Sequence, residues 1–168
     1  MKMIRLWLCL VLLCYAHPAW PMGDLPLSSL GQPLSGKLAP EFILELLSGK
    51  SMSLKEFREG KKAIMIFWAT WCPHCREELE ALSLKLEEIS SKDVKVILVN
   101  VGEAREDVQS FLQSRHLALD CFLDEDNTIS GLYGVRGVPT ALLINEAGVI
   151  IDIQNDFPYD YETKFHSR

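Results

Sequence analysis

A continuous apolar run followed closely by two cysteines is the feature that most restricts the fold of this chain. Residues Ala63–Ala69 are all apolar, which is typical of a strand buried on both faces in the middle of a sheet. Cys72 and Cys75 follow, and from Pro73 onward leucine and isoleucine recur at the spacing of an amphipathic helix. The cysteines therefore lie where a central strand passes into a helix, whose first turn brings both sulfur atoms within bonding distance.

Further apolar segments, separated by turn residues, alternate between strand and helix patterns. The expected strands are 41–47, 63–69, 94–101, 121–123, 140–144 and 149–153. The expected helices are a short capped one at 53–57, a long one from 73 to about 89, one marked by Val108, Phe111 and Leu112, and a short one at 129–133. Strands that alternate with helices and end in a hairpin predict a mixed α/β sheet with helices on both faces.

Composition divides the chain into four parts. Residues 1–20 carry two basic residues ahead of an apolar stretch, the order of a secretory signal, and we expect a cleaved signal peptide or an uncleaved N-terminal membrane anchor. Residues 21–39, rich in Pro, Gly, Ser and Leu, read as a linker. Residues 40–153 form the expected domain, and 154–168 a C-terminal tail with little helical periodicity. The leader predicts an extracytoplasmic location, in a bacterium the periplasm.

Charge and cysteine count exclude several classes of protein. With 17 basic and 23 acidic residues the net charge is -6, so neither nucleic acid nor an anionic membrane surface is an expected partner. Of five cysteines, Cys9 and Cys14 lie in the leader, and three remaining cysteines are not a disulfide framework. Each leader cysteine follows a leucine rather than a small residue, which disfavours a lipoprotein.

The cysteine pair has the features of a redox site. We expect Cys72 to be the nucleophile, because the unpaired N–H groups and the dipole at a helix start favour a thiolate. Cys75, one turn further in, is expected to be more buried and to act as the resolving thiol. Pro73 suits the first helical turn, and His74 places an ionisable imidazole beside the pair, so both favour the thiolate. The only cofactor expected is the redox-active disulfide itself.

Metal-binding readings of the same cysteines are weaker. A structural zinc site needs four ligands, and the sequence holds no second C-x-x-C, so we expect no metal. Haem attachment needs C-x-x-C-H, but Arg76 takes the last position. Copper(I) held by Cys72, Cys75 and His74 stays open as an alternative, as does a catalytically silent binding module. Cys121 lies in an expected buried strand and is expected to be inert.

Four segments together resemble the thioredoxin superfamily, and within it the exported TlpA- and ResA-like thiol-disulfide oxidoreductases. They are FWATWCPHCREEL at 67–79, VNVGE at 99–103, YGVRGVPT at 133–140 and LINEAG at 143–148. The resemblance covers about Pro40 to Ile153. It implies a thioredoxin-like fold whose usual last helix is truncated or missing here, since the pattern stops after Ile153.

The resemblance also implies roles for residues that the sequence pattern alone does not mark as functional. Pro139 by itself reads as a loop proline, but the resemblance implies a cis Val138–Pro139 bond facing the cysteines. It implies that the Val138 backbone pairs with an extended segment of a partner protein, and that Trp71 shapes the surface offered to partners. Glu103 becomes a buried acid that relays a proton to or from Cys75; the alternative is a surface acid at a helix start.

Two cues disagree on the direction of electron flow. The Pro73-His74 pair is found in DsbA-like oxidants, whereas the longer resemblance is to proteins that reduce disulfides. An oxidant needs a stabilised dithiol form, and a reductant needs a comparatively stable disulfide. We expect a reductase that acts on protein thiol and disulfide substrates, such as apocytochrome c or other secreted thiol proteins, and is recharged by a membrane electron donor. A DsbA-like oxidant or isomerase is the alternative.

Overall fold

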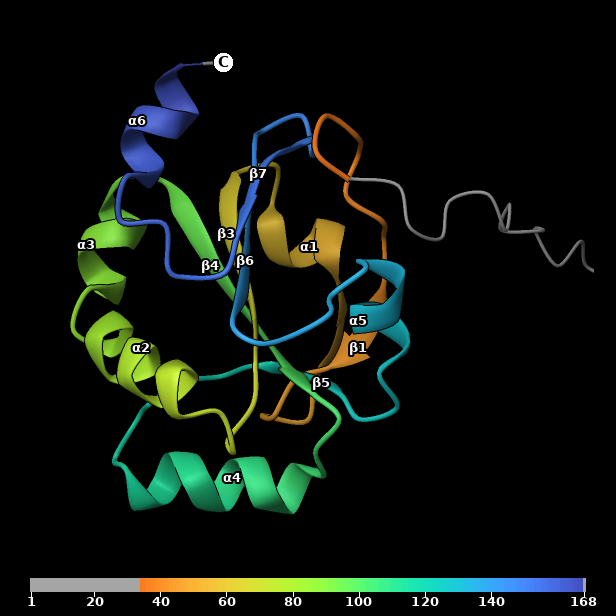
Figure 1. Cartoon of the computed structure of the whole chain (residues 1–168), viewed down its shortest axis with the longest axis vertical. Helices are drawn as coiled ribbons and strands as arrows, with labels where there is room; N and C mark the ends of the chain where they lie inside the picture. Colours follow the sequence, from red (N-terminus) through yellow and green to blue (C-terminus); the bar gives the residue numbers. More distant parts are fainter. Residues whose placement is uncertain (1–33, 168) are drawn as a thin grey trace, which may run out of the picture.

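The computed structural model describes residues 34–167, so the predicted leader, 1–20, and most of the predicted linker, 21–39, lie outside the described residues. A five-stranded mixed sheet in the order β5-β4-β3-β6-β7 forms the centre (Figure 1). Strands β3, β4 and β5 run parallel, while β6 and β7 are antiparallel to their neighbours. Their bounds are β3 Lys62–Trp68, β4 Val94–Val101, β5 Phe122–Asp124, β6 Thr140–Ile144 and β7 Ile150–Gln154.

Strand β3 divides the core into two layers. Because side chains alternate along a strand, Ile64, Ile66 and Trp68 enter one cluster while Met65 and Phe67 enter the other. All five are at most 3% exposed. The unbroken apolar run therefore marks the strand that is covered on both faces, which confirms the prediction.

Helices cover both faces of the sheet, as predicted. Helices α2, α3, α4 and α6 contribute to the first cluster, and α1 and α5 lie with the small β1–β2 hairpin on the other side (Figure 1). The bounds are β1 Ile43–Glu45, β2 Ser51–Ser53, α1 Leu54–Arg58, α2 Pro73–Ser83, α3 Leu86–Ser91, α4 Arg105–Ser114, α5 Thr128–Leu132 and α6 Tyr161–His166. The architecture is the mixed α/β fold expected from the sequence.

The single helix expected over 73–89 is two helices. Helix α2 ends at Ser83, whose hydroxyl donates to the carbonyl oxygen of Glu80 at 2.7 Å, and α3 begins at Leu86. Leu84, between them, is 87% exposed. A serine side chain that bonds to a carbonyl of its own helix competes with the backbone hydrogen bonds there. The spacing of apolar residues continues across the break, so the sequence pattern does not reveal where α2 ends.

The ordered fold extends beyond the predicted domain at both ends. Upstream of Pro40, Gly36 and Ala39 donate their N–H groups to carbonyl oxygens of the β6–β7 hairpin at 2.7 and 2.8 Å. Downstream, the tail predicted to carry little helical period contains the six-residue helix α6. Tyr161 and Phe165, four residues apart, bury their rings in the core. This aromatic spacing is a helical signal too short to stand out in the sequence.

None of the helices between residues 34 and 167 combines the length and apolar character needed to cross a membrane.

Candidate active site

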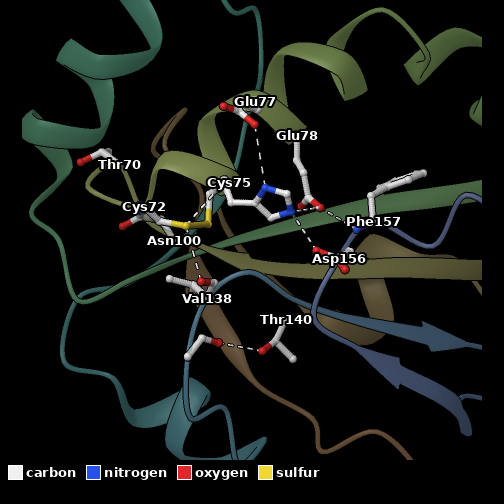
Figure 2. The surroundings of a disulfide bond; sticks show 12 residues. Thr70, Cys72, Cys75, Glu77, Glu78, Asn100, Val138, Thr140, Asp156 and Phe157 are labelled. Carbon is white, nitrogen blue, oxygen red and sulfur yellow. Dashed lines mark hydrogen bonds and ion pairs between the residues drawn. A yellow bond between two sulfur atoms is a disulfide. The ribbon is translucent and has the colours of Figure 1, made fainter.

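A disulfide joins Cys72 and Cys75 at the start of α2 (Figure 2). Cys72 is the N-cap residue, and its Sγ accepts a hydrogen bond from the backbone N–H of Cys75 at 3.2 Å. Pro73 occupies the first helical position, where the backbone N–H that proline lacks would have no partner within the helix. Cys72 is 4% and Cys75 1% exposed, so Cys75 is the more deeply buried, as expected, while the roles of nucleophile and resolving thiol stay predictions.

The loop before β6 lies against the disulfide (Figure 2). The Val138–Pro139 peptide bond is cis, as the resemblance implied. The carbonyl oxygen of Val138 lies 3.5 Å from Sγ of Cys72, and Thr140 Oγ1 donates to the Gly137 carbonyl at 2.7 Å, which closes the loop. Val138 thus presents backbone polar groups beside the reacting sulfur.

Trp71, next to Cys72 in the chain, is 65% exposed. An exposed ring of this size beside a redox site offers a partner protein apolar contact area. Its predicted role in substrate binding stays a prediction, as does that of Val138 and Pro139.

His74 is held by carboxylates. Its Nε2 lies 2.8 Å from Asp156 Oδ1 and 3.7 Å from Glu78 Oε1, and its Nδ1 lies 3.9 Å from Glu77 Oε2. The hydrogen bond to Asp156, supported by the charges of Glu78 and Glu77, raises the pKa of His74 above its ordinary value of 6.5. The three carboxyl groups around the imidazole therefore favour its protonated form.

Glu78 is a site residue that the sequence reasoning missed. It stands three residues after Cys75 on α2, its side chain is only 10% exposed, and both residues line the same narrow, mostly apolar gap, which has no room for a water molecule. Burial raises the pKa of Glu78 above its ordinary value of 4.5, although the N–H of Phe157, which donates to Oε1 at 2.8 Å, opposes that shift. The signal was an acid on the same helix face as a buried cysteine.

Glu103 binds the loop that leads from β3 to Cys72. One carboxylate oxygen, Oε2, accepts hydrogen bonds from the Thr70 N–H and from Asn100 Nδ2, both at 2.7 Å, and Oε1 accepts the Thr70 hydroxyl. Asn100 is fully buried. These contacts make Glu103 an anchor for the loop two residues before Cys72; its predicted role as a proton carrier stays a prediction.

Cys121 is a free thiol that is 1% exposed. Desolvation, with a smaller contribution from Asp120, raises the pKa of the Cys121 thiol to about 12. Burial of the thiol agrees with the sequence analysis, and a raised pKa disfavours the reactive thiolate; the expected inertness of Cys121 stays a prediction.

Comparison with known proteins agrees with this geometry. Residues 35–153 match the family model of the AhpC/TSA family. The chain is 35% identical over 119 residues to the thiol-disulfide oxidoreductase ResA of Halalkalibacterium halodurans, a match that covers 71% of this chain and 67% of the relative. The ResA of Bacillus subtilis is 33% identical, with 70% and 65% covered. The thioredoxin-like protein YneN of Bacillus subtilis is 31% identical over 90% of both chains.

Solved structures give the same result. A thiol:disulfide interchange protein DsbE from Chlorobium tepidum superposes with a TM-score of 0.69 at 26% identity, covering 79% of this chain and 96% of that one. StoA from Bacillus subtilis superposes with a TM-score of 0.63 at 25% identity, covering 78% and 98%. This chain belongs to the AhpC/TSA family and, within its thioredoxin-like fold, is a thiol-disulfide oxidoreductase of the ResA type.

Proposed function

We propose that this oxidoreductase works as an extracytoplasmic reductase of protein disulfides. The observation that carries the direction is the surroundings of His74. An imidazolium that faced the cysteines alone would stabilise the Cys72 thiolate and so make the disulfide a strong oxidant. Here the imidazole pairs with Asp156 at 2.8 Å and lies within 4 Å of Glu77 and Glu78.

The balance of charge around the disulfide follows from these contacts. Three carboxyl groups surround the one imidazole, so the charge of His74 is engaged by these acids and stabilises a thiolate at Cys72 less than an unpaired imidazolium would. A thiolate that is less stabilised makes the dithiol less stable relative to the disulfide. The protein therefore favours giving electrons to a substrate over taking them.

The reaction is a pair of thiol-disulfide exchanges. The Cys72 thiolate attacks one sulfur of the substrate disulfide, forms a mixed disulfide and releases the first substrate thiolate. Cys75 then loses its proton and attacks Sγ of Cys72, which releases the second substrate thiolate and forms the Cys72–Cys75 disulfide. Two electrons pass to the substrate. Glu78, which lines the same narrow gap as Cys75 one helical turn away, is the carboxylate proposed to take the Cys75 proton.

Substrate docking in this proposal uses the loop before β6. An extended segment of the partner pairs with the backbone of Val138, whose carbonyl lies 3.5 Å from the Cys72 sulfur. Trp71 contacts the same partner across its exposed ring. Apocytochrome c and other secreted thiol proteins are the proposed substrates, and a membrane electron donor restores the dithiol. Residues 1–20 deliver the protein to the periplasm as a signal peptide or anchor.

One measurement tests the direction. The Cys72–Cys75 couple is equilibrated with glutathione and dithiothreitol buffers, and its potential is read from the fraction of disulfide. We expect a value well below roughly -120 mV, the potential of DsbA. A value near that of DsbA would reverse the assignment in favour of an oxidant or isomerase.

A further inference from the structure

A hollow of about 690 Å³ opens on the surface beside the disulfide, between α2 and the segment that follows β7. Three side chains in it carry metal-ligating atoms that all lie within 4.8 Å of one another: His74, Glu78 and Asp156. Figure 2 shows Glu78 on α2 facing Asp156 on the later segment. Residues from two distant parts of the chain thus converge at one point.

Glu78 supplies a second, independent observation. Nine-tenths of its side chain is buried, and its Oε2 is shielded from solvent without a hydrogen-bond partner. A buried carboxylate oxygen without a partner is costly. The oxygen that faces His74 is the other one, Oε1, at 3.7 Å, so a cation held by both oxygens of Glu78 would also give Oε2 a partner.

We propose that His74, Glu78 and Asp156 bind one divalent transition-metal ion, with Zn²⁺ as the best-matched case. Zinc takes imidazole nitrogen and carboxylate oxygen at about 2.0–2.2 Å, and three protein ligands with one open position form a common zinc site. Tetrahedral bonds of about 2.0 Å place ligand atoms roughly 3.3 Å apart. The distances from His74 Nε2 to the two carboxylates, 2.8 and 3.7 Å, bracket that value.

The surroundings of the ligands suit such an ion. Glu77 lies 3.9 Å from the Nδ1 atom of His74, too far for a hydrogen bond, and adds negative charge beside the ligating imidazole. The N–H of Phe157 already holds Oε1 of Glu78 at 2.8 Å. The ion replaces the proton on Nε2 of His74 and needs no thiolate, so the site is complete in the disulfide form.

Calorimetry on the full chain tests the proposal. The disulfide form, with its remaining thiols blocked by N-ethylmaleimide, is titrated with ZnCl₂. We expect one ion per chain, and His74→Ala and Asp156→Asn should each weaken binding at least about tenfold. Glu87→Gln removes an exposed carboxylate of α3 outside the hollow and should leave the affinity within about twofold. MgCl₂ should bind more weakly, because it prefers oxygen ligands.

A second readout locates the ion. The imidazole ¹⁵N signal of His74 should shift on saturation with zinc, while the signals of His116 and His166 stay in place. Both substituted side chains are more than half exposed, so the variants should melt as the parent does; His74→Gln replaces His74→Ala if that variant unfolds. Absence of saturable binding, or binding that His74→Ala and Asp156→Asn leave unchanged, would overturn the site. The reductase direction is tested separately, by the reduction potential measured with a metal chelator present, so failure of the zinc site and failure of the reductase proposal are distinguishable.

Discussion

The backbone N–H of Phe157 donates to Oε1 of Glu78 at 2.8 Å, across 79 residues of sequence. The bond fixes one carboxylate oxygen of Glu78 and leaves Oε2 buried without a partner. A residue on the C-terminal segment thereby positions an acid that lines the same narrow gap as Cys75. This contact motivates the first prediction.

Glu78→Gln should slow the attack of Cys75 on the mixed disulfide. Glutamine keeps the acceptor for Phe157 but cannot take a proton, and loss of a general base costs about 10²–10⁴-fold in rate. Quenched-flow trapping of the mixed disulfide with a model substrate measures this step. Glu77→Gln, at an 80% exposed neighbour, is the matched control. Equal rates in the two variants would remove Glu78 from the mechanism.

Glu103→Ala should lower the free energy of unfolding by about 1–3 kcal/mol, because it leaves the partly buried Thr70 N–H and the buried Asn100 amide without their acceptor. Urea denaturation measures the loss. Glu103→Gln separates this anchoring from the predicted proton transfer. If Glu103 carries the Cys75 proton, the pH profile of the resolving step changes in the glutamine variant; a profile identical to the parent's would exclude that role.

His74→Ala should shift the reduction potential by less than about 30 mV, which corresponds to a tenfold change in the exchange constant. The reason is that the His74 charge is already balanced by Asp156 and its neighbouring carboxylates. Glutathione equilibration of parent and variant, in buffer with a metal chelator, gives the two potentials. A fall of several times this size would mean that His74 stabilises the thiolate as a DsbA-like oxidant requires.

Cys121 should resist alkylation in the folded protein. With burial raising the pKa of Cys121 to about 12, the thiolate fraction at pH 8 is on the order of 10⁻⁴. It rises tenfold with each pH unit. Peptide mapping after iodoacetamide treatment should show Cys121 unmodified in the native protein and modified in guanidinium. Rapid labelling of the native protein would show that the segment just before β5 opens readily.

Phe165→Ala should cost about 3–5 kcal/mol of stability, the usual cost of removing a buried aromatic side chain. Phe165 is 7% exposed and belongs to the same core cluster as α2 and β3. Tyr159→Ala, at a 61% exposed ring on the same segment, should cost less than about 1 kcal/mol. Thermal denaturation of both variants compares them. Equal small losses would mean that α6 is not part of the cooperative unit.

Local pattern accounts for most of the fold. The bounds of β4 and β6 match the expected strands 94–101 and 140–144, because both are mostly apolar segments that lie inside the sheet, with a neighbouring strand on each side. The capped helix α1 was readable from Ser53 and Glu56, which form a capping box.

The site was only half readable. The C-x-x-C spacing identifies the cysteine pair, and the family resemblance predicts the cis Val138–Pro139 bond. The burial of Glu78 and its contact with Asp156 depend instead on how the segment after β7 folds back over α2. Side chains about 80 residues apart come together there through tertiary packing, and a local sequence pattern carries no information about such contacts. An exposed acid and a buried one look the same in sequence.

The return of the C-terminal segment onto α2 also has a consequence for biosynthesis. On the ribosome the strand that precedes Cys72 and the helix that follows it are complete long before Asp156 and Phe157 emerge. A nascent chain therefore holds a cysteine pair whose imidazole still lacks its hydrogen-bonded carboxylate and whose buried acid is unanchored. Its thiols acquire their final reactivity only when the last strand and the segment after it have been made.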